Sequence, residues 1–342
     1  MNAPGEASLD HATHRAQALA LPWLVADVGG TNARFGWVDD ASLRVTRVQT
    51  LPVANYQGPA EAATAYLQGL ALGPGHSPAV PRRSAWALAT ALDGDWVELT
   101  NGHWRFSRSA LQQSLGLEDL RLLNDFEALA LSLPHLDPSQ LRAHGTLPRA
   151  QGMLAVIGPG TGLGVAGVVQ TAQGWKALPG EGGHATLPAT DDHEAQVLAE
   201  VRRHFEHVSA ERLLSGIGLP VLHRAVCAVA GQACPDLSAP QIVDAGTQGA
   251  DPMCRRTLDL FCALLGSFAG NVALTLGARG GVYIGGGIVP RLGERFFQSS
   301  FREKFEAKGR FRGYLADIPT ALITDTLAAL TGAAASLDPG TG

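Results

Sequence analysis

Two glycine-threonine turns, one in each half of the chain, have the composition of phosphate-binding loops. The first turn lies in residues 27–34 (DVGGTNAR) and the second turn in residues 158–164 (GPGTGLG). Glycines allow a tight turn whose backbone N–H groups point outward. Because glycine has no side chain to block the approach, these N–H groups can donate hydrogen bonds to phosphate oxygens. One such turn is a weak signal, but two copies between apolar segments indicate an internal duplication. The sequence therefore predicts two phosphate-binding turns.

An asparagine-aspartate pair could supply a base for proton transfer. Asn124 and Asp125 follow an apolar run and precede a helix-forming stretch. A carboxylate at a strand-to-helix junction often does no more than cap the helix. In a protein that binds a triphosphate, however, a fixed aspartate can accept the proton of an attacking hydroxyl. The pair therefore has two interpretations, a helix cap and a general base.

Three further polar side chains are suited to binding the hydroxyls of a sugar. Glu181 and His184 stand three positions apart in a segment too rich in glycine for a regular helix or a central strand. They could converge on vicinal hydroxyls, each of which offers a donor and an acceptor, or they could be incidental residues of a surface turn. Glu211 is expected in the first turn of a helix, where the helix dipole alone would favour an acid.

Both turns join one strand to another strand. Residues 23–26 and 35–38 are predicted strands around the first turn, and 153–157 and 165–169 repeat this arrangement around the second turn. Rossmann and Walker sites need glycines that open a helix, and a Walker site needs a lysine that neither turn has.

The remaining pattern alternates helices with strands, as in an α/β fold. The predicted helices are 61–70, 194–205 and the apolar stretch 252–276, and the further predicted strands are 85–89, 96–99 and 280–284, the last ending in the glycine cluster 285–287 with a helix starting at Pro290.

Composition excludes several classes of protein. The chain has 342 residues, of which 46% are hydrophobic and 17% are charged, enough for two lobes with their own cores. A net charge of −5 and the lack of a basic run argue against a nucleic-acid partner. Because no stretch approaches ~18 consecutive apolar residues and no leader pattern opens the chain, no membrane contact and a cytoplasmic location are expected.

The four cysteines lack the paired C-x-x-C spacing of a zinc site. They are Cys227, Cys234, Cys254 and Cys262, and all fall in a helix-rich stretch. Cys254 and Cys262 are expected to lie in a helix as small hydrophobic residues. In a reducing cytoplasm, no disulfide is needed.

Six motifs in order resemble the motif set of bacterial glucokinases, in the hexokinase/actin/Hsp70 ATPase superfamily. The motifs are residues 27–34, 124–126, 158–164, 178–184, 209–212 and 285–291, and the resemblance runs from about residue 24 to 325. It implies a two-lobed actin-like ATPase (ribonuclease H-like) α/β fold with the active site in the cleft between the lobes. It also implies phosphorylation of glucose at O6 by ATP with Mg²⁺, and a homodimer.

The resemblance further implies a role for each matched residue. In the first turn the phosphate-binding residues would be Asp27, Gly29, Gly30, Thr31, Asn32 and Arg34, with Asp27 near Mg²⁺ through water. On the other lobe, the phosphates and the adenosine would meet Gly160, Thr161, Gly162, Gly285, Gly286 and Gly287. Asp125 would be the general base for the sugar 6-hydroxyl, and the other sugar-side residues would be Asn101, Asn124, Glu181, His184 and Glu211.

The chain is expected to consist of an N-terminal extension and two lobes. Residues 1–21 are polar and patternless and are predicted to be a mobile extension, residues 22–134 with 326–342 form a small lobe, and residues 135–325 form a large lobe. Prolines at 134, 138 and 148 favour the boundary after Pro134.

Other functions remain open at this point. Residues 89–92 lack the Pro or Gly that the family places before Gly94, and residues 325–329 lack its Asn-x-Gly, which leaves the exact sugar preference undecided. The alternatives are a related kinase with another hexose or with ADP or polyphosphate as donor, and a non-catalytic sugar sensor on the same fold. Another alternative is a kinase of the related repressor group, which phosphorylates N-acetylated sugars. Such a kinase would be expected to carry a zinc site of a histidine and clustered cysteines, and this sequence is predicted to lack one. A DNA-binding regulator would need more than the residues before the first turn.

Overall fold

The computed structural model describes residues 20–40, 42–70, 80–90 and 92–338, and contacts divide the chain into two compact units. Among these residues, the first unit holds the chain up to His135, the stretch Gln170–Ala177 and the chain from Thr326 onward. The second unit holds Leu136–Val169 and Leu178–Asp325. The predicted extension 1–21 lies outside the described residues except for positions 20 and 21. The predicted lobe boundaries stay a prediction that limited proteolysis can test.

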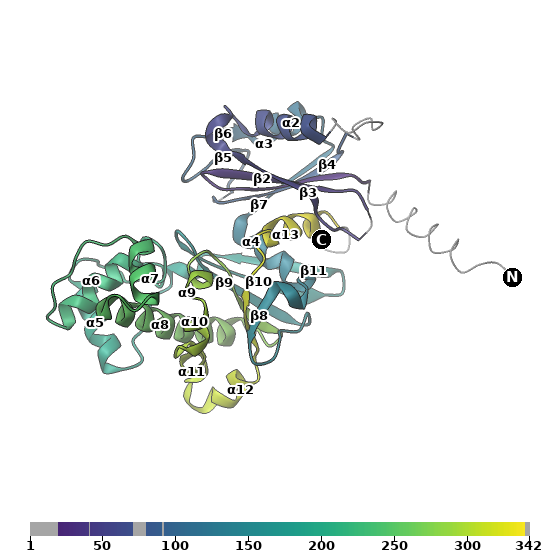
Figure 1. Cartoon of the computed structure of the whole chain (residues 1–342). Helices are drawn as coiled ribbons and strands as arrows, with labels where there is room; N and C mark the ends of the chain where they lie inside the picture. The colour runs from purple at the N-terminus through teal and green to yellow at the C-terminus, as the bar shows by residue number, and fades with distance from the viewer. Residues whose placement is uncertain (1–19, 41, 71–79, 91, 339–342) are drawn as a thin grey trace. The chain divides into compact units, whose positions relative to one another are not determined.

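The first unit is built on a mixed five-stranded sheet (Figure 1). Its strand order is β3-β2-β1-β4-β7. Its strands are β1 (Trp23–Val28), β2 (Asn32–Val38), β3 (Thr46–Pro52), β4 (Arg83–Leu88) and β7 (Asp119–Asn124). β1 pairs antiparallel with β2, as the hairpin prediction required, and β1, β4 and β7 are parallel. Val28, Leu88 and Asn124 are register partners, so the carboxyl ends of these three strands share one edge.

Helices and a small ribbon complete the first unit. They are α2 (Pro59–Leu70), α3 (Arg108–Ser114), α4 (Asp125–Ser132), α13 (Ala328–Leu337), the ribbon β5 (Trp96–Glu98) with β6 (Arg105–Ser107), and the short turns η1 (Val53–Asn55) and η2 (Leu133–His135). The core contains Trp86, Phe35 and Tyr66, all fully buried, because the apolar faces of the sheet and α2 meet there.

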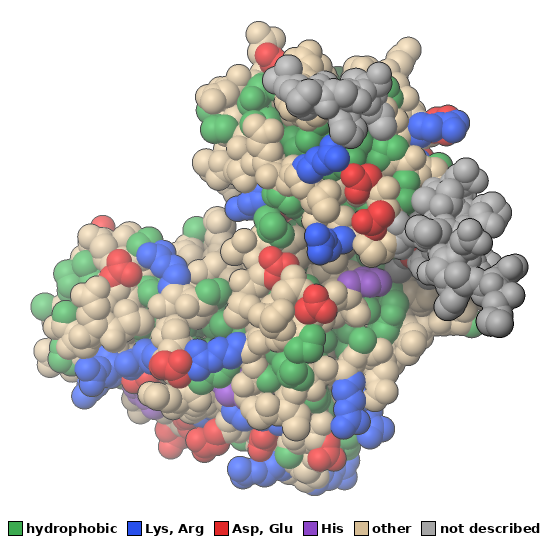
Figure 2. All heavy atoms as spheres, turned by 45° about the vertical axis from the view of Figure 1, so that its right-hand side comes forward, with side chains coloured by type: hydrophobic (Ala, Val, Ile, Leu, Met, Phe, Trp, Pro, Cys, Tyr) green, Lys and Arg blue, Asp and Glu red, His purple; other side chains and the backbone are tan. Residues whose placement is uncertain are grey.

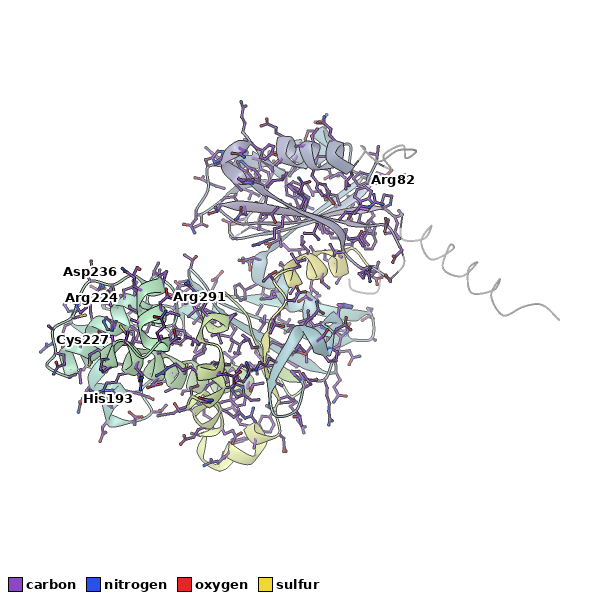
Figure 3. All side chains as sticks on the ribbon, in the orientation of Figure 1. Arg82, His193, Arg224, Cys227, Asp236 and Arg291 are labelled. Atoms are coloured by element: carbon purple, nitrogen blue, oxygen red, sulfur yellow. The ribbon has the colours of Figure 1, made fainter. Side chains whose placement is uncertain are left out.

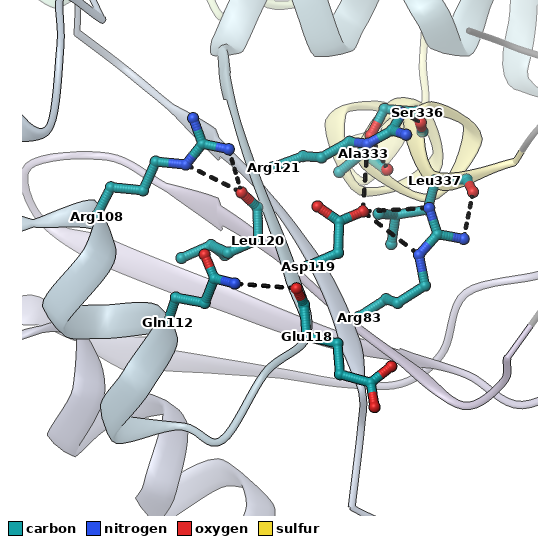
Figure 4. A network of polar contacts seen from close by, with 10 residues as sticks. All are labelled: Arg83, Arg108, Gln112, Glu118, Asp119, Leu120, Arg121, Ala333, Ser336 and Leu337. Carbon is teal, nitrogen blue, oxygen red and sulfur yellow. Dashed lines mark hydrogen bonds and ion pairs between the residues drawn. The ribbon is translucent and has the colours of Figure 1, made fainter.

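Helix α13 fixes the position of α4. A Cβ atom at Gly332 would lie 1.6 Å from the carbonyl oxygen of Ala128, so only glycine permits this close packing. At the other end of α13, Arg83 donates to the carbonyl of Leu337 at 3.0 Å and Arg121 donates to the carbonyl of Ser336 (Figure 4). Cations at a helix C-terminus satisfy carbonyls that have no intrahelical partner.

The second unit is built on a six-stranded sheet with the order β11-β10-β9-β12-β13-β8, of which the end of β10 and the start of β11 fall in the stretch Gln170–Ala177 that is grouped with the first unit. Its strands are β8 (Leu141–His144), β9 (Met153–Pro159), β10 (Leu163–Thr171), β11 (Gly174–Gly180), β12 (Gly281–Ile284) and β13 (Thr320–Ile323). β9 and β10 form the second predicted hairpin, and β12 runs parallel to β9. The second turn and the glycines that follow β12 therefore lie at the same end of adjacent strands.

The helices of the second unit pack around a long central helix, α8 (Pro252–Leu276). The others are α5 (Asp192–Arg202), α6 (Leu219–Val229), α7 (Ala239–Thr247), α9 (Val289–Leu292), α10 (Glu294–Gln298), α11 (Phe301–Glu306), α12 (Arg312–Ala316), and the turns η3 (Pro138–Gln140), η4 (Gly182–His184) and η5 (Gly309–Phe311). α8 is long and apolar enough to cross a membrane, but 78% of its apolar window is buried inside the protein. A Cβ atom at Gly266 would lie 2.1 Å from the carbonyl oxygen of Phe301, which makes α8 a close-packed core helix.

Helix α5 is shorter than predicted. The apolar spacing predicts helix to residue 205, but α5 ends at Arg202. The ring of Phe205 instead lies 4.4 Å from the guanidinium carbon of Arg212, a contact that the sequence pattern does not contain. Cys254 and Cys262 lie buried in α8, as predicted. Acidic and basic side chains are interspersed on the face of the described residues that Figure 2 shows.

Candidate active site

The first turn is a closed hairpin tip at the end of β1. Asp27 faces Arg34 in the β1–β2 register, and the N–H of Gly29 donates to the carbonyl of Asn32 at 3.0 Å. The N–H of Val53 donates to the carbonyl of Thr31 at 2.9 Å, which ties the tip to the segment after β3. The turn is thus held at a fixed place on the sheet edge, as a loop that binds phosphate must be.

The backbone of Asn101 packs against Gly30 in the first turn. A Cβ atom at Gly30 would lie 2.0 Å from the carbonyl oxygen of Asn101, and a Cβ atom at Gly102 would lie 3.3 Å from the Cα of Gly30. The absence of a side chain at Gly30 is therefore a packing requirement. It places Asn101, predicted on the sugar side, directly against a residue predicted to hold phosphate.

Asp27 carries a half-buried carboxylate beside one cation. Its Oδ2 lies 3.0 Å from Nη1 of Arg34, which donates a hydrogen bond to it. Burial raises the pKa of Asp27, and the charge and hydrogen bond of Arg34 work in the opposite direction. A hard carboxylate oxygen of this kind has the donor chemistry that Mg²⁺ prefers.

The motif of Asn124 and Asp125 allows two interpretations, a helix cap or a general base, and Asn124 is the residue that caps the helix. Asn124 is the N-cap of α4: its Oδ1 accepts from the N–H of Phe126 at 2.9 Å, and its Nδ2 donates to the carbonyl of Thr90 at 3.3 Å. Asp125 is the first residue of α4, and its Oδ1 accepts from the same N–H at 3.0 Å. Because Asn124 performs the capping, the Asp125 carboxyl is not needed as the cap.

The Asp125 carboxyl has the electrostatics of a base. Burial, and after it the nearby charge of Asp27, raise the pKa of Asp125 to about 6, although the N–H of Phe126 lowers it. A carboxyl with that pKa is ionised at neutral pH but accepts a proton more readily than an ordinary aspartate. Asp27 and Asp125 come from neighbouring parts of the same sheet edge, where β1 and β7 end.

The second turn is held in place by Glu211. The N–H of Gly160 donates to the carbonyl of Gly162 at 2.9 Å, and the N–H of Leu163 donates to Oε2 of Glu211 at 2.9 Å. A Cβ atom at Gly162 would lie 2.5 Å from that same Oε2. Glycine at 162 is therefore required for the carboxylate to approach the turn.

The glycine cluster after β12 lies against the strand that leads into the second turn. The N–H of Gly285 donates to the carbonyl of Ile157 at 2.8 Å. Gly286 has a φ of +75°, and a Cβ atom there would lie 2.4 Å from the carbonyl oxygen of Pro159. The start of the cluster 285–287 therefore lies beside residues 157–159, which lead directly into Gly160, Thr161 and Gly162.

Glu181, His184 and Glu211 come together, as their proposed role needs. Nε2 of His184 lies 4.0 Å from Oε2 of Glu181, and Nδ1 lies 3.9 Å from Oε1 of Glu211. The backbone explains the convergence, since the N–H of Glu211 donates to the carbonyl of Gly183 at 2.8 Å. A Cβ atom at Gly183 would lie 2.0 Å from the carbonyl oxygen of Leu163, so this cluster sits directly on the second hairpin.

The predicted helix at Glu211 is wrong. Glu211 lies in a run of turns, and the nearest helix, α6, begins at Leu219. The N–H groups of Ala210 and Glu211 donate to the carbonyls of Ala185 and Gly183, and Ser209 forms a bridge with Thr186, so this segment is paired with residues 183–186. The physical reason is tertiary pairing, which local propensity does not contain.

Two positioning residues were missed at the level of sequence. The carbonyl of Thr90 accepts from Asn124, and the N–H of Gly216 donates to the carbonyl of Gly160 at 2.7 Å. Gly216 could have been suspected from its place in the glycine pair of residues 216–218, but Thr90 acts through its backbone and leaves no signal of residue type.

Known proteins share the sequence pattern of this chain along most of its length. The family model named Glucokinase matches residues 24–339. A glucokinase of Chromobacterium violaceum is 49% identical over 322 residues, covering 93% of this chain and 90% of that protein. A glucokinase of Paramagnetospirillum magneticum is 48% identical over 313 residues, covering 91% and 96%.

The fold comparison agrees with the sequence comparison. The crystal structure of a glucokinase from an Antarctic psychrotroph matches with a TM-score of 0.85 at 39% identity, covering 92% of this chain and 98% of that one. The predicted family and the actin-like α/β kinase fold are confirmed. This chain belongs to the glucokinase family.

Proposed function

We propose that Asp125 is the general base in the reaction of this family, the phosphorylation of glucose by ATP. The oxygen of the 6-hydroxyl forms a bond to the γ-phosphorus, the bond from that phosphorus to the β-phosphate oxygen breaks, ADP leaves, and the hydroxyl proton moves to the Asp125 carboxylate. The observation that carries the proposal is the half-buried Asp125 carboxyl beside Asp27 at the end of β7, with a pKa of about 6. Its capping role is already filled by Asn124.

The phosphates of ATP would bind the two turns. The N–H groups of Gly29 and Gly160 donate within their own turns, so the phosphate oxygens would accept from the other N–H groups of the two turns. The glycine cluster 285–287 would leave room for the adenosine. When bound with the nucleotide, Mg²⁺ would neutralise phosphate charge, and the Asp27 carboxylate would hold the ion through water.

The sugar hydroxyls would be held by the polar side chains that the second unit brings together. Glu181, His184 and Glu211 offer two carboxylates and an imidazole within about one sugar ring of each other. Asn101 and Asn124 would bind the same sugar from the residues of the first unit. The backbone of Asn101 packs against Gly30, and the Asn124 side chain donates to the carbonyl of Thr90, so the Asn124 side chain is oriented before the sugar arrives.

Replacing His184 or Glu181 by alanine should raise the KM for glucose by roughly tenfold to a hundredfold, since a hydroxyl buried against a lost partner costs ~1–3 kcal/mol. The KM for ATP should barely change. Steady-state kinetics with each substrate varied in turn check this. The matched control is His193→Ala, an exposed histidine on α5 away from the cluster, which should leave both constants unchanged. Equal weakening for glucose and ATP would instead indicate a damaged fold.

The pH dependence should report Asp125. Below about pH 6 the carboxyl becomes protonated and can no longer accept the hydroxyl proton, so kcat/KM for glucose should fall about tenfold for each pH unit. The measurement is kcat/KM from about pH 5 to 8, which reports the free enzyme. Asp27→Asn removes the charge that helps to raise this pKa, so the acidic limb should move to lower pH in that variant. An unmoved limb would assign the ionisation to another group.

One assay separates the kinase from its alternatives. Glucose-dependent formation of ADP from Mg-ATP at millimolar substrate, repeated with a panel of hexoses and with ADP or polyphosphate as donor, tests the substrate and donor together. Turnover with glucose and ATP supports the proposal, whereas glucose binding without any turnover would make the protein a sensor on the same fold.

Three further expectations stay predictions. They are the dependence on Mg²⁺, the homodimer and the cytoplasmic location. The placement of the active site in a cleft between the lobes is likewise a prediction, and substrate-bound structures would test it.

A further inference from the structure

A histidine and two cysteines, unrelated to the glucose chemistry, gather beside α6. His223 and Cys227 lie on α6, and Cys234 lies in the segment that follows the helix. One ligand atom from each of these three residues lies within 4.8 Å of the others. His223 and Cys227 are four positions apart and therefore share one face of the helix. Both are buried, whereas Cys234 lies at the surface.

After α6, a turn reverses the chain so that Cys234 lies beside the helix. Gly231 takes a φ of +63°, and the N–H of Gln232 donates to the carbonyl of Cys227 at 3.0 Å. Further along, Asp236 pairs with Arg224 of α6 at 3.8 Å (Figure 3). The turn before Cys234 returns the chain to α6, and the thiol lies near the helix face that carries Cys227. The ion pair after it is solvent-exposed and contributes little.

Thr257 determines which nitrogen of His223 faces the cysteines. The Thr257 hydroxyl has one proton, which it donates to the carbonyl of Met253 at 2.8 Å. At 2.9 Å from Nδ1 of His223, the same hydroxyl oxygen must therefore accept a hydrogen bond from Nδ1–H. Nε2 is left with its lone pair directed at Sγ of Cys227, 3.8 Å away. An imidazole fixed in this way through its other nitrogen is the usual arrangement of a metal-bound histidine.

We propose that His223, Cys227 and Cys234 bind a Zn²⁺ ion through Nε2 and the two Sγ atoms. Zinc bonds of about 2.0–2.1 Å to nitrogen and 2.3 Å to sulfur, in tetrahedral geometry, place neighbouring ligand atoms somewhat less than 4 Å apart. A set already within 4.8 Å needs only a small contraction to reach that spacing.

Two further donor groups near Cys227 come from the start of α8: the buried thiol of Cys254, in its first turn, and the carboxylate of Asp251, its N-cap. With Thr257 also on α8, an ion at this place would join α6, the segment carrying Cys234 and the central helix of the unit. Binding requires the thiols to lose their protons, so metal binding should release protons.

This site uses none of the residues assigned to ATP or glucose. Its ligands come from α6 and the segment after it, whereas the sugar cluster comes from residues 181–184 and 211. The zinc proposal therefore stands or falls independently of the kinase proposal.

The test is a metal titration of the full chain, reduced and stripped of metal by a chelator. Co²⁺ is the first probe, because thiolate-bound cobalt absorbs in the near ultraviolet and a tetrahedral site absorbs in the visible. We expect one Co²⁺ per chain with both absorptions, loss of both when Zn²⁺ is added, and a zinc-dependent rise in Tm.

Variants connect the absorption to the three ligands. Cys234→Ser changes an exposed residue and should still fold. Because it removes a proposed ligand, it should weaken Co²⁺ binding by more than ~10–100-fold, the effect of removing a residue that only hydrogen-bonds to a ligand. Thr257→Val should weaken binding by about 10–100-fold without reducing the thiolate absorption at saturation. The matched control is Cys262→Ala, a buried cysteine of α8 outside the cluster, which should bind Co²⁺ like the unchanged protein.

Two results would overturn the proposal. One is the absence of thiolate-to-cobalt absorption in the reduced, unchanged protein. The other is equal Co²⁺ affinity in the unchanged protein and in Cys234→Ser, which would place the bound ion elsewhere.

Discussion

Replacing Asp125 by asparagine should lower kcat by roughly two to four decades while glucose binding stays largely intact. The amide keeps the shape of the carboxyl and can still accept from the N–H of Phe126, but it cannot take up the proton of the 6-hydroxyl. The loss should therefore fall on turnover. The measurement is steady-state kinetics for kcat, together with a direct titration of glucose by calorimetry.

A neighbouring acid gives the matched control for this variant. Glu127 lies on the same helix, α4, and burial raises its pKa as well. Glu127→Gln keeps a side-chain oxygen near the start of the helix and should leave kcat within a few-fold of the unchanged protein. If Asp125→Asn behaved like Glu127→Gln, Asp125 would be a structural residue of the helix start.

Stability should change in the direction opposite to activity. The pKa of Asp125 in the folded protein, about 6, lies above its ordinary value of 3.8, because burial disfavours the charged form. Between these two pH values the folded state binds more protons than the unfolded state, so the contribution of this group to stability falls as the pH rises. At neutral pH, Asp125→Asn removes a disfavoured charge and should raise the free energy of unfolding by about 1–3 kcal/mol. Urea unfolding at about pH 7 measures this gain.

Gly30→Ala should disable the first turn, with kcat/KM for ATP reduced by roughly tenfold to a hundredfold or more. The new methyl group would lie 2.0 Å from the carbonyl oxygen of Asn101, so either the turn or the segment carrying Asn101 must move. Overpacking of this kind costs ~1–3 kcal/mol, and here the displaced backbone is the proposed phosphate-binding surface. Kinetics with ATP as the varied substrate measure the loss.

Two other glycines show whether the close approach is the cause. A Cβ atom at Gly58, at the start of α2 in the same unit, would meet no atom within 4 Å, so Gly58→Ala should leave the kinetics unchanged. At Gly29, in the first turn itself, the nearest atom would be the carbonyl oxygen of Asn32 at 3.9 Å, so Gly29→Ala should cost much less than Gly30→Ala. Equal losses at positions 29 and 30 would mean that flexibility of the turn, and not the contact with Asn101, is what matters.

Much of the fold could be predicted from short-range patterns in the sequence. Both hairpins, the helix α2 and the strand-to-helix junction at Asn124 could be predicted, because strand alternation, helical spacing and glycine turns depend on neighbouring residues. Six ordered motifs also identified the family, since each motif keeps its residue types next to one another in the chain. The roles of the individual site residues remain predictions that the variants above can test.

Contacts between distant segments were decided only by the tertiary structure. Three features depend on backbone groups from elsewhere in the chain. They are the capping of α4 by Asn124, the turn in place of a helix at Glu211, and the packing of Asn101 on Gly30. The cluster of His223, Cys227 and Cys234 has the same origin, because its residues lack the paired C-x-x-C spacing of a zinc site and the turn at Gly231 returns Cys234 to the helix. Residue types set the chemistry that is available, whereas long-range packing decides which groups lie within a few ångströms of each other.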